Sequence, residues 1–206
     1  MIDAREAIAR LRDGNRRFAA GESSRDGLGL SRRAELVAAQ DPHAIVLGCS
    51  DSRVPAEIVF DQGLGDLFVI RVAGNIVSPS QVGSVEFAAA RFNTRLVVVL
   101  GHSQCGAITA TLEELGRARD TRSVNLRSIV DRVRPSVEAL LHTDIARDPA
   151  ALHHHAVRAN IRASANHLRH GSAILEQLIA EDGLLVVGAE YSLDTGVVDF
   201  FDGVPA

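Results

Sequence analysis

Short runs of consecutive apolar residues recur along the chain. Three of them are nearly uninterrupted: 44–48, 67–71 and 96–100. Such runs are typical of strands that are buried on both faces of a sheet. Helix-favouring stretches at 55–60 and 82–92 separate them. The alternation of strand and helix predicts an α/β fold with a mainly parallel central sheet and flanking helices.

Helical periodicity marks the first part of the chain. Asp3 and Glu6 form a capping-box pattern, after which an apolar stripe runs from Ala4 to Phe18. Ser31 can cap a second, short helix that reaches about Gln40. We therefore expect a helical arm over residues 1–40.

The second half of the chain continues the pattern and ends in a hairpin. Helices are expected at 105–114, 124–141, 149–170 and 172–181, and strands at 184–189 and 197–201. The turn-rich segment 192–196 joins the last two strands, so the final strand should be an antiparallel edge strand. We expect a single domain over 1–206, in which 44–206 form the α/β core.

Composition narrows the class of protein. The chain has 206 residues, of which 46% are hydrophobic and 23% charged, as in one ordinary globular domain. A net charge of -4 and a pI near 6.0 give no basic face for nucleic acid. No apolar run approaches the ~18 residues of a membrane helix, and the start lacks an apolar signal core. We expect a cytoplasmic protein that binds neither nucleic acid nor membrane.

The candidate chemistry lies directly after two of the predicted strands. Cys49 follows the first strand, and His102 and Cys105 follow the third. The carboxyl ends of parallel strands form the edge where ligands bind, so these loops converge if their strands are neighbours. Two thiolates and one imidazole leave one vacant position on a tetrahedral zinc ion, which is the arrangement of catalytic sites. We predict one Zn²⁺ per chain, with buried packing of the same residues as the alternative.

Asp51 and Arg53 stand beside the first cysteine. In an extended segment, side chains two residues apart point to the same side, so these two can form a bidentate pair. Asp51 could instead take the fourth zinc position and close the site, or the pair could be an ordinary loop salt bridge. The residues themselves leave these alternatives open.

Two motifs together resemble the signature of the β-class carbonic anhydrases. They are 49–54 (CSDSRV) and 101–107 (GHSQCGA), and the segments 61–71, 73–75 and 188–196 resemble the family as well. The resemblance implies reversible hydration of carbon dioxide to bicarbonate and a proton. It implies that Asp51, held by Arg53, orients the attacking water, with the backbone N–H of Gly106 as a further donor.

The resemblance also implies pocket residues and an assembly. Gln40 matches a glutamine that reaches the active site across a dimer interface, and Phe68 matches an aromatic residue of the pocket. Phe87 stands where some relatives have tyrosine. Packing at an interface or in the core is the alternative for Gln40 and both Phe residues. The resemblance implies a homodimer, or a tetramer made of two dimers.

One subgroup of the family has a regulatory bicarbonate site. Arg71 and Tyr191 match two of its residues, whereas Val46 replaces its tryptophan and the chain contains no Trp. This replacement argues against that regulation.

Other readings use the same residues. The run 101–104 after a strand starts like the nucleophile elbow of a serine hydrolase, but Cys105 replaces the glycine that this motif requires. A zinc-stabilised sensor with Asp51 permanently bound, or hydrolysis of carbon disulfide or carbonyl sulfide, is compatible with the ligands. The three histidines 153–155 point in different directions on a helix, so a solvated face is expected rather than a second metal site.

Overall fold

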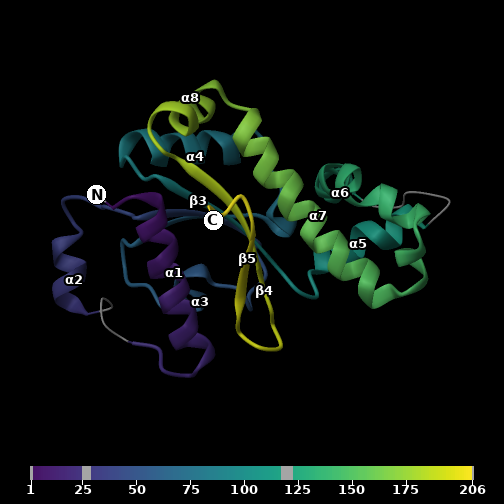
Figure 1. Ribbon diagram of the computed structural model, residues 1–206, viewed down its shortest axis with the longest axis horizontal. Helices are drawn as coiled ribbons and strands as arrows, with labels where there is room; N and C mark the ends of the chain where they lie inside the picture. Colours follow the sequence, from purple (N-terminus) through teal and green to yellow (C-terminus); the bar gives the residue numbers. More distant parts are fainter. Residues whose placement is uncertain (1, 25–28, 117–122, 206) are drawn as a thin grey trace.

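A five-stranded sheet forms the centre of the molecule. The computed structural model describes residues 2–24, 29–116 and 123–205. The strands are β1 (Ala44–Gly48), β2 (Leu67–Arg71), β3 (Leu96–His102), β4 (Leu185–Tyr191) and β5 (Val198–Asp202). They are arranged in the order β2-β1-β3-β4-β5, with β5 alone antiparallel to its neighbour (Figure 1). The single domain, the mainly parallel sheet and the antiparallel edge strand confirm the predicted fold class.

The strand order places the ends of β1 and β3 side by side. The register joins Gly48 of β1 to Leu100 of β3. From β1 the chain runs to β2 on one side of β1, and β3 lies on the other side of β1. The strand order reverses here, so the carboxyl edge between β1 and β3 is a topological switch point, where ligands bind in α/β sheets. β3 extends to His102, beyond the predicted end at Leu100, because Gly101 and His102 still pair with Glu190 and Tyr191 of β4.

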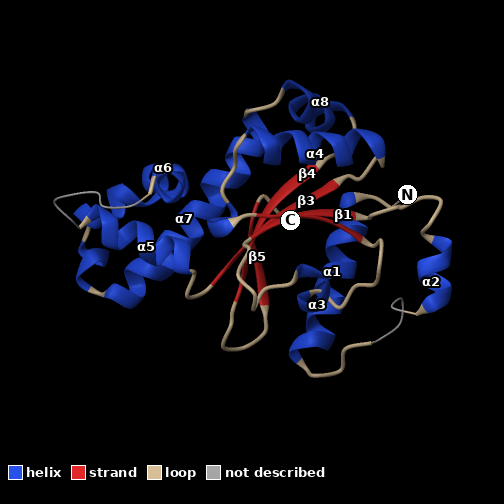
Figure 2. Cartoon of the chain, turned by 180° about the vertical axis from the view of Figure 1, so that it is seen from behind, coloured by secondary structure: helices blue, strands red, loops and turns tan. Residues whose placement is uncertain are grey.

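One face of the sheet is covered by α1 (Ala4–Ala19) and α3 (Ala56–Val59) (Figures 1 and 2). The side chain of Asp3 caps α1 by accepting a hydrogen bond from the N–H of Glu6 at 2.8 Å. Ile8 and Leu11 of the apolar stripe are buried against the sheet. The stripe of the N-terminal helix therefore packs on its own domain.

The second helix is shorter than predicted. α2 (Leu30–Glu35) ends well before Gln40, and none of its residues is buried. A helix of this length gains little from its own hydrogen bonds, and here it gains no burial to extend it. Figure 1 shows α2 at the end of the molecule opposite α5 and α6.

The other face carries most of the helical mass. Its helices are α4 (Pro79–Arg91), α5 (Gly106–Leu115), α6 (Val124–Val137), α7 (Pro149–His170) and α8 (Ala173–Glu181), with short 3₁₀ turns at Ala73–Asn75, Glu138–His142 and Asp144–Arg147. α4 begins before the predicted Val82 because Pro79 fits its first turn. α6 ends at Val137 and the predicted continuation to Leu141 is a 3₁₀ turn. In the described segments, none of the helices combines the length and the apolarity that crossing a membrane requires.

Candidate metal centre

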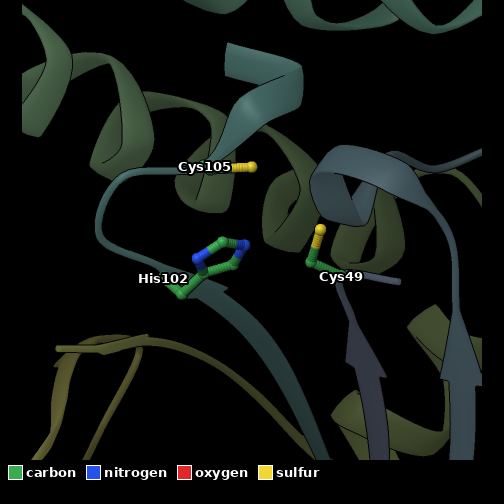
Figure 3. Close-up of side chains that lie close together, drawn as sticks. All are labelled: Cys49, His102 and Cys105. Atoms are coloured by element: carbon green, nitrogen blue, oxygen red, sulfur yellow. The ribbon is translucent and has the colours of Figure 1, made fainter. Parts of the chain in front are cut away.

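Three potential ligands converge at the carboxyl edge of the sheet. Cys49 follows β1, His102 ends β3, and Cys105 precedes the first residue of α5. Their ligand atoms all lie within 4.8 Å of one another, and the exposed fractions are only 4%, 0% and 2%. Figure 3 shows the three side chains pointing toward one another. The structure therefore brings together the three residues that the sequence proposed as ligands.

The imidazole of His102 is oriented for coordination. Its Nδ1 lies 2.8 Å from the carbonyl oxygen of Ser103, and since a carbonyl can only accept, Nδ1 carries the hydrogen. In the neutral ring this leaves the Nε2 lone pair free. Nε2 is buried and has no hydrogen-bond partner among the described residues. A buried imidazole nitrogen without a partner is costly unless a ligand or metal completes it.

The two sulfur atoms are held in an environment that favours negative charge. The backbone N–H of Gly74 donates to Sγ of Cys49 at 3.4 Å. In the protein without a cation, the hydrogen bond from the thiol of Cys105 lowers the pKa of Cys49 to about 4. The same contact, together with burial, raises the pKa of Cys105. The proton therefore stays on Cys105 while Cys49 is the thiolate, and a soft divalent cation between them would satisfy both sulfur atoms as thiolates.

Asp51 is held at the rim of this cluster by Arg53. The Nε atom of Arg53 donates to Oδ1 of Asp51 at 2.9 Å, and Nη2 donates to Oδ2 at 2.8 Å. These hydrogen bonds hold the pKa of Asp51 well below its usual range. Oδ2 lies 3.8 Å from Nε2 of His102. The bidentate pair predicted from the sequence is present and borders the metal cluster.

Comparison with known proteins decides the family. The family model described as carbonic anhydrase matches residues 44–198. The carbonic anhydrase of Mycolicibacterium smegmatis is 40% identical over 190 residues, covering 92% of this chain and 89% of that protein. Carbonic anhydrase 2 of Mycobacterium tuberculosis is 38% identical over 186 residues, covering 90% and 87%. The chain belongs to the carbonic anhydrase family.

Solved structures agree with the β class of this family. The β-carbonic anhydrase CcaA is 26% identical with a TM-score of 0.75, covering 95% of each chain. The β-carbonic anhydrase CafA of Aspergillus fumigatus has the same fold, with a TM-score of 0.76 at 21% identity, covering 98% of this chain and 91% of that one. The chain is thus a β-class carbonic anhydrase, as its two motifs predicted.

Of the remaining predicted pocket residues of this carbonic anhydrase, Gly106 lies beside the metal cluster, whereas Gln40, Phe68 and Phe87 lie away from it within the single chain. Gly106 is the first residue of α5 beside Cys105, and a Cβ added there would meet nothing within 4 Å. Gln40 is exposed and precedes β1, so it lies at the amino end of the strand whose carboxyl end carries Cys49. Phe68 pairs with Ile45 early in β1, and Phe87 is 54% exposed. Within one chain, only Gly106 adjoins the cluster in sequence and structure.

Arg71 and Gly74 support the site in ways that the sequence did not reveal. Arg71 donates to the carbonyl oxygens of Cys49 at 3.0 Å and Asp51 at 2.6 Å, so it ties the ligand loop to β2. Gly74 has a φ of +70°, which favours glycine. The sequence indicated these two residues through their place in the segments 61–71 and 73–75, which resemble the family. Tyr191, the other residue matched to the regulatory site, is buried against Phe18, and Val46 is buried in the core.

The other motifs singled out in the sequence have structural partners. Ser103 Oγ accepts a hydrogen bond from the N–H of Leu193 at 2.9 Å, which ties the loop after β3 to the hairpin loop. His154 and His155 are exposed, as expected for a solvated face. His153 differs from this prediction because it is half-buried and its Nε2 lies 3.3 Å from the carbonyl oxygen of Cys105.

Proposed function

We propose that this chain catalyses the zinc-dependent, reversible hydration of carbon dioxide, with one Zn²⁺ held by Cys49, His102 and Cys105. The observation that carries the proposal is the buried Nε2 of His102, which has no hydrogen-bond partner among the described residues and lies within 4.8 Å of both sulfur atoms. When bound, Zn²⁺ supplies Lewis-acid activation of water at neutral pH. Membership of the carbonic anhydrase family supports carbon dioxide as the substrate.

Asp51 and Arg53 would orient the reaction. Arg53 engages both oxygens of Asp51, which leaves the carboxylate ionised and fixed in direction. Oδ2 faces the cluster and would accept a hydrogen bond from the attacking water, aligning its lone pair with the carbon of the substrate. The N–H of Gly106, at the start of α5, would donate to an oxygen of the bound anion.

The Asp51–Arg53 pair supports an open metal centre. As the fourth ligand, Asp51 would bind the cation through an oxygen that Arg53 now holds, so the cation would compete with the Arg53 side-chain nitrogens for the carboxylate. That alternative describes a closed state or a sensor, and the present pairing favours a position left for water.

The catalytic unit would be a homodimer, or a tetramer of two dimers. β2 is an edge strand of the sheet, and Phe68, Phe87 and Phe92 form an aromatic cluster beside it with ring centroids 5.6–6.2 Å apart. Gln40 lies before β1, at the opposite end of that strand from Cys49, so its role in the site would be on a second copy. The exposed helix α2, part of the 1–40 arm, would gain burial on that copy. The similar enzymes of Sordaria macrospora are described as tetrameric, at 23% identity and a TM-score of 0.75.

A cytoplasmic location fits this chemistry. Both cysteines are free and buried in the site. Thiolate ligands last longest where thiols are kept reduced, as in the cytosol.

The regulatory bicarbonate site of some relatives is not expected here, since the small side chain of Val46 is enclosed in the core.

The deciding experiment combines metal analysis with stopped-flow measurement of carbon dioxide hydration by a pH indicator. We expect one zinc per chain and fast hydration in the wild type, and loss of both in Cys105→Ala. Zinc bound without hydration would favour the sensor, or carbon disulfide or carbonyl sulfide as substrate, which can be assayed on the same sample. Freshly purified protein without zinc would contradict the proposal.

A further inference from the structure

One face of α7 reaches the immediate surroundings of both cysteine ligands. His153, Asn160 and Ser164 lie on that face, because positions seven and eleven residues apart on a helix point in nearly the same direction. Each of the three contacts a loop at the carboxyl edge of the sheet. α7 packs across β3 and β4 of the sheet (Figure 1).

His153 contacts the backbone of the ligand Cys105. Its Nε2 lies 3.3 Å from the carbonyl oxygen of Cys105, so Nε2 carries the hydrogen and donates it. The same oxygen accepts the N–H of Thr109 at 3.0 Å. The peptide bond between Cys105 and Gly106 is trans, so the N–H of Gly106 points away from this carbonyl. Fixing the carbonyl therefore fixes both the Cys105 backbone and the direction of the Gly106 N–H.

Asn160 supports the other cysteine through one intermediate residue. Its Nδ2 donates to the carbonyl oxygen of Gly74 at 2.7 Å, and the N–H of Gly74 donates to Sγ of Cys49. Asn160 is only 2% exposed, so this contact is shielded from competing water. Ser164 continues the row by donating to the carbonyl oxygen of Asn75 at 3.0 Å.

The helix that carries these residues is itself firmly placed. The side chain of Ile161 fills the space above two glycines, since a Cβ at Gly101 or Gly188 would lie 2.6 or 2.8 Å from it. Gly101 immediately precedes His102. Arg158 donates to the buried carboxylate of Glu190 at 2.7 Å and links α7 to β4. An element anchored at these points can hold the ligand loops in one geometry.

We propose that α7 sets the geometry of both thiolate ligands, with His153 acting on Cys105 and Asn160 acting on Cys49 through Gly74. Both are positioning residues, since neither reaches the ligand atoms directly. The inference rests on the metal centre proposed above. Groups that orient the ligands of a metal typically change its affinity by about 10- to 100-fold.

Cobalt(II) reports this geometry directly because its thiolate charge-transfer bands depend on how the sulfur atoms meet the metal. We would load the wild type, His153→Leu and His153→Gln with Co²⁺, record the spectra, and measure the rate of metal loss to a chelator. His153→Leu should shift the bands and lose metal about 10-fold faster. His153→Gln, which can place an N–H near the same carbonyl, should return both readouts toward those of the wild type. His155→Leu, on the exposed side of the same helix turn, should leave them unchanged.

A second pair of variants tests the arm that supports Cys49. Asn160→Ala should also shift the bands, whereas Ser164→Ala, which loses an equally buried hydrogen bond to Asn75, should not. Unfolding curves of the metal-free proteins separate this effect from lost stability. Unchanged spectra and release rates in both His153→Leu and Asn160→Ala would overturn the inference while leaving the metal centre intact, and so would equal effects in the control variants. A wild type that takes up no Co²⁺ would instead contradict the metal centre itself.

Discussion

Arg53 holds both carboxylate oxygens of Asp51 and its backbone N–H adds a third hydrogen bond at 3.0 Å, so Asp51 is turned toward Arg53 while Oδ2 stays 3.8 Å from His102. Replacing Arg53 with Ala frees the carboxylate to swing into the metal position. We expect Arg53→Ala to keep its zinc and to lose about 10- to 100-fold in the rate of carbon dioxide hydration. Stopped-flow rates with metal analysis on the same samples would measure both.

The matched variant is Arg53→Lys. Lysine keeps the charge but lacks the planar fork of arginine, so it cannot reproduce the two parallel hydrogen bonds that fix the direction of the carboxylate. Its rate should lie between those of the wild type and Arg53→Ala. Full activity in Arg53→Ala would show that Asp51 does not depend on this pair.

Removing the metal should expose the two cysteines to oxidation. Without a cation the hydrogen bond from Cys105 lowers the pKa of Cys49 to about 4, so Cys49 is a thiolate at neutral pH beside a second thiol. After chelation, addition of a disulfide-forming oxidant should remove both free thiols and prevent zinc uptake until a reductant is added. Thiol titration with and without zinc measures this, and equal oxidation rates in both samples would contradict it.

Two glycines give opposite predictions for stability. Gly74 has a φ of +70° and a Cβ there would lie 3.0 Å from Cβ of Ala107, so Gly74→Ala should lower the free energy of unfolding by about 1–2 kcal/mol. Gly83 lies inside α4 with open space around it, so Gly83→Ala should raise it by about 0.4–1 kcal/mol. Denaturant unfolding of the metal-free proteins would test the contrast, which fails if the two changes have the same sign.

Burial of His43 makes the stability of the protein depend on pH. Burial lowers the pKa of His43 below the ordinary 6.5, and the positive charge of Arg10 lowers it further. The carboxylates of Asp66, Asp41 and Glu6 raise the pKa, but burial outweighs them. Between the folded and unfolded pKa values the unfolded chain binds more protons, so the free energy of unfolding falls as the pH falls below 6.5.

Replacement of His43 isolates this contribution from those of the other histidines. As the pH is lowered below 6.5, the free energy of unfolding of the wild type should fall more than that of His43→Gln. Urea unfolding at several pH values would measure it. A difference that stays constant with pH would refute the role of His43.

The aromatic cluster beside β2 gives a prediction about assembly. Phe87 is 54% exposed in the single chain and contacts Phe68 and Phe92. A carboxylate at this place in a buried interface would be left without a partner, so Phe87→Glu should dissociate the assembly and reduce activity. Light scattering after size exclusion measures the mass. Val124→Glu, at an exposed apolar position on α6, serves as the control and should keep the assembly.

The strands and the metal-ligating residue types could be predicted from the sequence, because apolar runs and the residues that directly follow them are local patterns along the chain. The runs 44–48 and 67–71 have the bounds of β1 and β2. β1 is buried at every position, as its unbroken apolar run indicates, whereas β2 is a half-buried edge strand that ends at the exposed Arg71. Cys49 and Cys105 stood out because each follows such a run or its loop directly. The capping of α1 by Asp3 was likewise determined within one helical turn.

Contacts between distant segments were decided only by the tertiary structure. Pairing with β4 carried β3 on to His102, and packing on the sheet rather than on a partner buried Leu11 of the N-terminal helix. The histidine that reaches Cys105 could not be told from its two neighbours by sequence, since the difference arises only where α7 crosses the ligand loops. Apolar periodicity reports which side chains are buried, because that depends on near neighbours along the chain. The partner that buries them, and so the geometry of the metal centre, follows from how helices and strands far apart in the sequence pack together.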